Sequence, residues 1–158
     1  MKPCVVIDNS IVMRWFHPSG SKKNLARAER YLGLLEDNQF VPTAPVILTM
    51  ELPNVLFRLL RIGELKGQVD TALTLWKNLE FDIIGSEFGS ALYVQSLSEL
   101  CKEHALSAYD AAYLELAIRI DCPLLTLDKA LEKAAVKMGV DTDISNGVRV
   151  ADRSKVPE

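Results

Sequence analysis

The chain has 158 residues, of which 49% are hydrophobic and 25% charged, and its formal net charge is −3. This length predicts one domain whose hydrophobic core is large enough to fold without disulfides or a structural metal. The acidic balance argues against a nonspecific nucleic-acid coat, and no apolar run approaches the roughly 20 residues that cross a bilayer. The short apolar run after the N-terminus does not fit a signal peptide, so we expect a cytoplasmic protein.

Hydrophobic periodicity predicts strands that alternate with helices along the chain. In the first half we expect a strand at Cys4–Ile7, a short helix at Ser10–Phe16, a helix at Lys23–Asp37, a strand at Phe40–Pro42, and helices at Pro45–Ile62 and Leu65–Asn78. In the second half we expect a strand at Leu79–Ile84, helices at Glu87–His104 and Ser107–Ile120, a strand at Pro123–Leu127 and a helix at Asp128–Met138. One further edge strand is expected near Val140–Ile144 or Val148–Val150.

This alternation predicts a three-layer α/β/α sandwich with a mostly parallel, roughly five-stranded sheet. Residues 1–150 would form the single domain and residues 151–158 a loose C-terminal tail. In such folds ligands bind outside the carboxyl ends of the strands, at a topological switch point. The three cysteines, Cys4, Cys101 and Cys122, show no zinc-ligand spacing, and we expect them to be reduced, partly buried thiols.

Two acidic residues directly follow predicted strands. Asp8 follows Cys4–Ile7, and Asp128 follows Pro123–Leu127. If the strands are parallel, both side chains lie at the edge of the sheet where such folds build their sites. Taken singly, each Asp is better explained as the N-cap of the next helix, because Asp is a favoured capping residue.

Two further acids lie on apolar helices. Asp110 stands three residues after the expected N-cap Ser107, as in an acidic variant of the capping box, yet small and apolar residues surround it. Glu51 shares a helix face with Asn54 and Arg58, and its other neighbours are apolar. An isolated carboxylate near a core is costly, so both acids are candidates for a site.

Four clustered carboxylates without a basic partner would repel and raise each other's pKa values unless a cation lies among them. Oxygen ligands without His or Cys suit Mg²⁺ or Mn²⁺. Such a cation lowers the pKa of a bound water and stabilises charge on a phosphoryl oxygen. The sequence therefore favours a metal site made by Asp8, Glu51, Asp110 and Asp128.

The same residues resemble a known family, the PIN domain, and within it the VapC-type toxins of prokaryotic toxin–antitoxin modules. The resemblance covers roughly Lys2 to Val140. It rests on Asp8-x-Ser10 after a first strand, Glu51 with Asn54 in a middle helix, Ser107-x-x-Asp110-Ala111-x-Tyr113, and Leu125-Thr126-x-Asp128.

The resemblance implies a metal-dependent endoribonuclease that hydrolyses RNA phosphodiester bonds with a metal-activated water. The four acids would be the catalytic and metal-binding residues, and Ser10, Asn54 and Thr126 would support them. It also implies a homodimer and inhibition by a small antitoxin protein.

Basic and aromatic side chains could contact the RNA. Candidates for phosphate contacts are Lys22, Arg27, Arg58 and Lys129, with a solvated helix face as the equally good alternative. Trp15, beside Asp8-x-Ser10, is the aromatic residue that we expect to be exposed and able to stack on a base.

Two other functions remain open at this point. One is a PIN-like partner-binding protein without catalytic activity, with exposed apolar residues such as Phe57 and Leu60 on a dimer or antitoxin face. The other is a Mg²⁺-dependent phospho-acceptor signalling domain with Asp8 beside a phosphorylated Asp.

Overall fold

The structure is a computed structural model that describes residues 2–66, 69–85, 89–144 and 147. The described residues form a four-stranded parallel sheet in the order β3-β2-β1-β4, together with seven helices. The strands are β1 (Cys4–Ile7), β2 (Val41–Pro45), β3 (Asp82–Ile84) and β4 (Leu124–Leu125).

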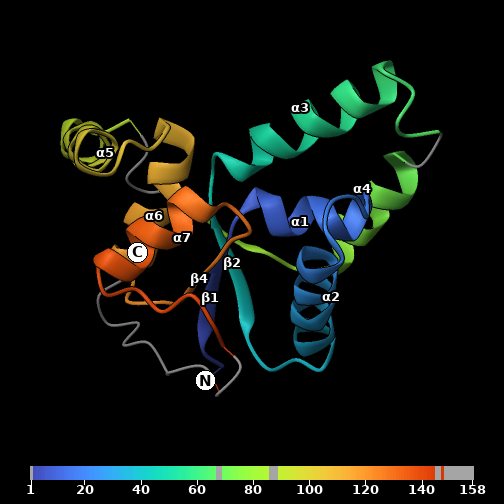
Figure 1. Ribbon diagram of the computed structural model, residues 1–158, viewed down its shortest axis with the longest axis horizontal. Helices are drawn as coiled ribbons and strands as arrows, with labels where there is room; N and C mark the ends of the chain where they lie inside the picture. The colour runs from blue at the N-terminus through green and yellow to red at the C-terminus, as the bar shows by residue number, and fades with distance from the viewer. Residues whose placement is uncertain (1, 67–68, 86–88, 145–146, 148–158) are drawn as a thin grey trace.

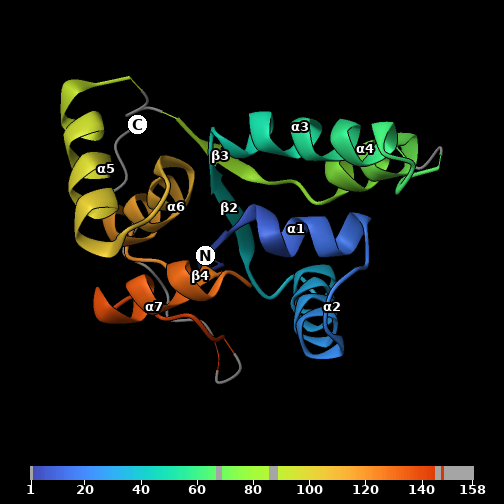
Figure 2. The same ribbon diagram turned by 45° about the horizontal axis from the view of Figure 1, so that its top comes forward.

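The helices occupy the connections between these strands. The first four are α1 (Asn9–Phe16), α2 (Lys22–Glu36), α3 (Leu48–Arg61) and α4 (Val69–Asn78). The last three are α5 (Ala91–His104), α6 (Ala108–Arg119) and α7 (Lys129–Lys137). Helices α1 to α4 lie on one side of the sheet and α5 to α7 on the other, in both views (Figures 1 and 2). The predicted α/β/α sandwich is therefore confirmed.

Strand β1 is at the centre of the sheet, and the burial of its residues explains its composition. All four of its side chains are buried, which is what a strand covered on both faces requires. Val6 pairs with Thr43 of β2 on one side and with Leu124 of β4 on the other. The chain runs outward from β1 through β2 to β3 and then returns to β4 on the far side of β1. The topological switch point therefore lies at the carboxyl ends of β1 and β4.

The sheet differs from the prediction in its number of strands. We expected about five strands, and the described residues contain four. Residues 140–144 do not form the predicted edge strand, although Leu124 N donates a hydrogen bond of 2.8 Å to the Asp141 carbonyl. The alternative position, Val148–Val150, and the predicted tail at 151–158 lie outside the described residues.

The expectation of three reduced thiols is wrong for two of the cysteines. Cys4 and Cys122 are joined as a disulfide, and Cys101 is free. The pairing of β1 with β4 explains this bond. Because Val6 is in register with Leu124, the residues two positions earlier also become lateral neighbours. Their Cα atoms are 6.0 Å apart, a normal separation for a disulfide. Sequence spacing could not reveal a contact between residues 118 positions apart.

We expect a thiol titration of the unfolded, non-reduced protein to count one free thiol, that of Cys101. The same titration after reduction should count all three cysteines of the chain. Three thiols before reduction would show that Cys4 and Cys122 are not bonded. A Cys101→Ser variant provides the control, because it should then show no free thiol before reduction.

No helix in the described part of the chain is both long enough and apolar enough to cross a membrane.

Candidate metal centre

Asp8 is delivered to the carboxyl end of the sheet by β1. Its backbone N–H still belongs to the sheet, donating to the Leu125 carbonyl at 3.0 Å. Its side chain is only 5% exposed. Oδ2 accepts hydrogen bonds from Ser10 Oγ at 2.6 Å and Thr126 Oγ1 at 2.7 Å. A carboxylate is therefore buried at the switch point with hydroxyl groups as its partners.

The two hydroxyl groups also join the end of β4 to the start of α7. Ser10 Oγ accepts from the backbone N–H of Leu127 at 2.9 Å, and Thr126 Oγ1 accepts from that of Asp128 at 3.0 Å. Each hydroxyl thus donates to Asp8 and accepts from the backbone beyond β4. Ser10 and Thr126 lie where their predicted supporting role requires.

Glu51 reaches the same region from α3. Its Oε2 accepts a hydrogen bond of 2.5 Å from the phenol of Tyr113 on α6. Tyr113 is fully buried, and its hydroxyl orients a carboxylate that lies 62 residues away in the chain. Glu51 is half-buried, and the hydrogen bond from Tyr113 fixes the orientation of its Oε2.

Asp110 combines two functions at the start of α6. Ser107 is the N-cap, and its Oγ accepts from the Asp110 backbone N–H at 3.1 Å. In return, Ser107 Oγ donates to Asp110 Oδ2 at 2.7 Å. The predicted N-cap Ser107 is therefore confirmed, while the reciprocal bond of the predicted capping box runs from the Ser107 hydroxyl rather than from its backbone N–H. The side chain is half-buried, and capping leaves its other oxygen uncommitted among the described residues.

The negative charges of neighbouring acids act on the carboxyl groups of Asp8 and Glu51. Burial raises the pKa of the Asp8 carboxyl; hydrogen bonds from Ser10 and Thr126 partly offset the rise, and the charge of Asp110 adds to it. Burial also raises the pKa of Glu51, and the charges of Asp8 and Asp110 raise it further. We call Asp8, Glu51 and Asp110 the acid cluster.

Tyr113 takes part in the same electrostatic arrangement. Burial and the charges of Asp8 and Glu51 raise the pKa of its phenol. The phenol therefore stays protonated and donates its hydrogen bond to Glu51.

Asp128 lies beside the acid cluster, and its side chain bonds the backbone of α7. Its Oδ1 accepts from the Leu131 backbone N–H at 2.8 Å, so the residue caps α7, which was the alternative explanation from the sequence. Asp8 also precedes a helix, but its side chain makes no cap hydrogen bond. The structure thus brings together three of the four predicted acids and places the fourth at their edge, joined to Asp8 by two successive hydrogen bonds through the Thr126 hydroxyl.

The residues of the acid cluster fit a divalent cation by their chemistry. No Lys or Arg among the described residues lies within ion-pair distance of Asp8, Glu51, Asp110 or Asp128. Their donors are hydroxyl and backbone N–H groups, which do not neutralise the charge. In the described part of the chain, no three His, Cys, Asp or Glu side chains converge tightly enough to ligate one ion directly. Mg²⁺ is bound through one or two carboxylates and keeps several waters, so the wider arrangement suits it.

The predicted RNA-binding and supporting residues have different environments. Lys22, Arg58 and Lys129 are exposed and make no ion pair with the described residues, as phosphate contacts would require. Asn54 is exposed on α3, and no hydrogen bond joins it to Glu51 within the described residues. Its predicted supporting role therefore has no contact behind it.

Arg27 and Trp15 both make contacts within the protein. Arg27 Nη2 bonds Glu132 Oε1 at 2.7 Å and the Thr142 carbonyl at 3.1 Å, tying α2 to α7 and the segment after it. Trp15 is half-buried, and its indole N–H donates to the Ala28 carbonyl at 2.8 Å, which joins α1 to α2. Trp15 is therefore less exposed than expected, and the RNA contacts of both residues stay predictions.

Sequence reasoning missed one cation near the acids, Arg14. A signal was present: Arg14 stands four residues after Ser10, so the two share a face of α1. The role of Tyr113 as the donor to Glu51 was also missed, because the two residues lie 62 positions apart in the chain.

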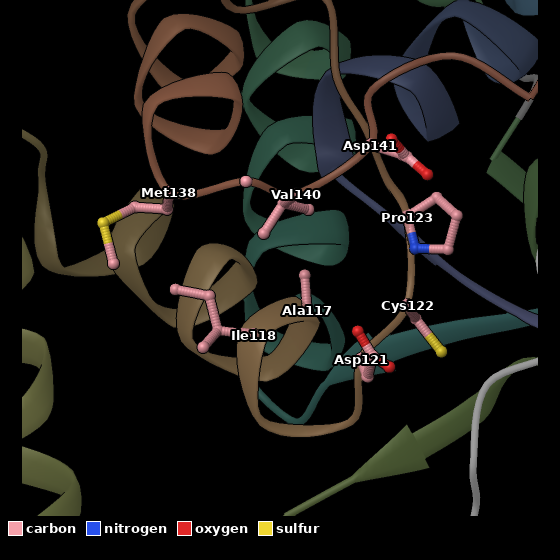
Figure 3. Close-up of a pocket in the computed structure, with 9 residues that line it drawn as sticks. Ala117, Ile118, Asp121, Cys122, Pro123, Met138, Val140 and Asp141 are labelled. Carbon is pink, nitrogen blue, oxygen red and sulfur yellow. The ribbon is translucent and has the colours of Figure 1, made fainter.

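A separate pocket of about 310 Å³ lies at the opposite end of the sheet from the acid cluster. It lies between the end of α6, the residues before β4 and the segment after α7 (Figure 3). Figure 3 shows Asp121 and Asp141 with Pro123 and Cys122 between them. Because it adjoins the amino end of β4, this pocket does not share residues with the acid cluster.

Comparisons with known proteins agree with this geometry. The PIN domain family model matches residues 5–137. The chain therefore belongs to the PIN-domain family, whose members are generally metal-dependent nucleases.

Among solved structures, the chain is similar to the crystal structure of PAE2754 from Pyrobaculum aerophilum. The TM-score is 0.60 at 19% sequence identity, over 84% of this chain and 79% of that chain. This likeness shows the fold alone. A search of curated proteins gave no match.

Proposed function

We propose that the protein is a Mg²⁺- or Mn²⁺-dependent endoribonuclease, the toxin of a toxin–antitoxin module. The observation that carries the proposal is the acid cluster: three carboxylates from β1, α3 and α6, with raised pKa values for Asp8 and Glu51 and no Lys or Arg of the described residues within ion-pair distance. Membership of a family of metal-dependent nucleases supports it.

Asp8, Glu51 and Asp110 would hold the cation, with Asp128 at its edge. Once bound, the cation lowers the pKa of a water and stabilises charge on the phosphoryl oxygens. Ser10 and Thr126 keep Asp8 oriented through hydrogen bonds to its Oδ2.

Tyr113 keeps Glu51 Oε2 in place, which leaves Oε1 free to face the reaction. Hydrolysis forms a bond from a water oxygen to phosphorus and breaks the phosphorus–oxygen bond to the next nucleoside. A carboxylate with a raised pKa, such as Glu51, is suited to accept the proton of that water near neutral pH.

The partners that we propose are RNA, a small antitoxin and a second copy of this chain, in the cytoplasm. The residues that support a protein interface lie on α3, whose outer side carries exposed apolar side chains: Met50, Phe57 and Leu60. From the sequence, Phe57 and Leu60 could belong either to a dimer or antitoxin interface or to the core. Their exposure agrees with an interface, since such side chains gain by being covered.

We expect the protein to cleave single-stranded RNA with Mg²⁺ or Mn²⁺ and to lose this activity with EDTA. The measurement is gel analysis of an end-labelled RNA, with and without the metal. Activity should return when excess Mn²⁺ is added after EDTA, which separates metal removal from damage to the protein. Undiminished cleavage in EDTA would contradict the proposal.

The alternative is a PIN-like partner-binding protein without catalytic activity, which the loose spacing of the acids would suit. Calorimetric titration with Mn²⁺ separates the two. Binding that is lost in Glu51→Gln supports the nuclease, and absence of binding in the wild-type protein supports the alternative.

A further inference from the structure

A cleft of about 280 Å³ adjoins the acid cluster, between α1, the loop that leads to α2 and the junction of β4 with α7. Its polar lining comes from Ser10, Arg14, Ser19, Asn24 and Asp128. Ser10 belongs to both places, because its Oγ donates to Asp8 and its side chain also lines the cleft. A ligand that occupies the cleft therefore lies next to the acid cluster.

Arg14 gives the cleft a positive charge that is fixed in position by hydrogen bonds but makes no ion pair with the described residues. Its Nη1 donates to the carbonyl oxygen and the Oγ of Ser19. Its Nε and Nη2 make no hydrogen bond to any described residue. No carboxylate in the described part of the chain lies within ion-pair distance of its guanidinium. The donors that remain free form the edge with which Arg recognises phosphate.

The other groups on the cleft are compatible with an anion. Ser10, Ser19 and Asn24 are neutral hydrogen-bonding residues. Asp128 is the one carboxylate in the lining, and its Oδ1 is turned to the Leu131 backbone N–H. Helix α7 starts directly after Asp128, so the positive end of its dipole lies at the edge of the cleft.

We propose that this cleft binds a phosphodiester group of the RNA strand next to the one that is cleaved, with Arg14 as its main ligand. The proposal rests on the proposed function for the nature of the strand. The contact with Ser19 holds the guanidinium in place before binding, which lowers the entropy cost of ordering it. Arg14 is then a positioning residue, which sets where the strand lies relative to the acid cluster.

A purely structural role is the competing explanation, because Arg14 also links α1 to the loop at Ser19. A structural role would change the stability of the loop, but it would not change the number of ions released when RNA binds. The salt dependence of binding therefore separates the two roles.

The test is RNA binding by fluorescence anisotropy, with Mn²⁺, over a range of salt concentrations. All proteins carry Asp110→Asn to prevent cleavage, and we compare Arg14→Gln, Arg14→Lys and Arg61→Gln in this background. Arg61 is exposed at the end of α3 and provides a control with the same change of charge. We expect Arg14→Gln to weaken binding about tenfold and to reduce the slope of log K against log salt by about 0.7, the value for one phosphate on a single strand. Arg14→Lys should keep the slope.

A second measurement identifies the phosphate. We use a series of RNAs, each with one phosphate replaced by a neutral methylphosphonate at a different position. At one position the replacement should weaken binding to the protein that retains Arg14 but not to Arg14→Gln. Equal affinity and slope in Arg14→Gln and Arg61→Gln would overturn the subsite. The two proposals can also fail separately. If the wild-type protein does not cleave RNA with Mn²⁺ but Arg14→Gln still weakens RNA binding, the nuclease is refuted and the subsite is supported.

Discussion

Asp8→Asn is expected to stabilise the metal-free fold at neutral pH and to remove catalysis. The carboxylate is buried at the end of β1, and no cation among the described residues offsets its charge. An amide of nearly the same shape accepts the same hydrogen bonds from Ser10 and Thr126 without the cost of burying a charge. Cleavage should fall by about 10²–10³-fold, the range seen when one electrostatic element of a preorganised site is lost.

The pH dependence of stability follows from the direction in which burial moves the pKa of Asp8. This pKa is raised above its ordinary value of 3.8, so the folded protein binds more protons than the unfolded chain above that pH. The free energy of unfolding then falls as pH rises from about 3.8 through the raised pKa, and it stays lower beyond it. In Asp8→Asn this contribution to the slope is absent.

Urea unfolding of both proteins between pH 4 and pH 7 measures this effect, because the midpoint of the transition reports stability when its slope is unchanged. Asp82→Asn, at an exposed position of β3, is the matched control and should behave as wild type. Saturating Mn²⁺ should stabilise the wild-type protein, by about 2.7 kcal/mol at a concentration 100 times the dissociation constant. It should not stabilise Asp8→Asn. A variant less stable than wild type at pH 7 without metal would show that Asp8 is not under electrostatic strain.

Element type and order were predictable because the hydrophobic periodicity of this chain is strong. Strand β1 matched its prediction at both ends, since every residue in it is apolar and the next is Asp8. Elements whose ends depend on tertiary contacts were less accurate. Strand β4 is shorter than Pro123–Leu127, because the chain turns out of the sheet where Thr126 bonds Asp8. Pro45, expected to start a helix, pairs instead with Ile84 in the sheet.

The acid cluster was predictable in part for a topological reason. The sequence shows which residues follow parallel strands, and the fold then places Asp8 and Asp128 at one edge of the sheet. It does not show which oxygen faces which partner. Asp128 turns to the backbone of α7, whereas Asp8 turns to Thr126, although both follow a strand in the same way. The partner of Arg27 is 105 residues away in the chain, which no local pattern reveals.

Thr126→Val is expected to destabilise the protein and to shift its activity toward higher pH. The Thr126 hydroxyl is fully buried, donates to Asp8 and accepts from the backbone N–H of Asp128. Val has nearly the same shape but leaves the Asp128 N–H without this acceptor and leaves Asp8 Oδ2 with Ser10 Oγ as its one remaining side-chain donor among the described residues, so we expect a loss of about 1–3 kcal/mol. In the wild-type protein the hydrogen bond from Thr126 lowers the pKa of Asp8. Removing this bond therefore raises that pKa further.

Thr43→Val is the matched control, because Thr43 is equally buried and, among the described residues, its hydroxyl bonds only the Val41 carbonyl of its own strand, at 3.3 Å. Chemical unfolding should show a larger loss of stability for Thr126→Val than for Thr43→Val. In the pH profile of RNA cleavage, the acid limb of Thr126→Val should move to higher pH, and Mn²⁺ affinity should fall by about 10–100-fold, as for other partners of metal ligands. Thr43→Val should leave both unchanged. A loss of stability with the same acid limb and the same Mn²⁺ affinity would mean that Thr126 only fills space, because a hydroxyl that tunes the Asp8 carboxylate must alter its protonation.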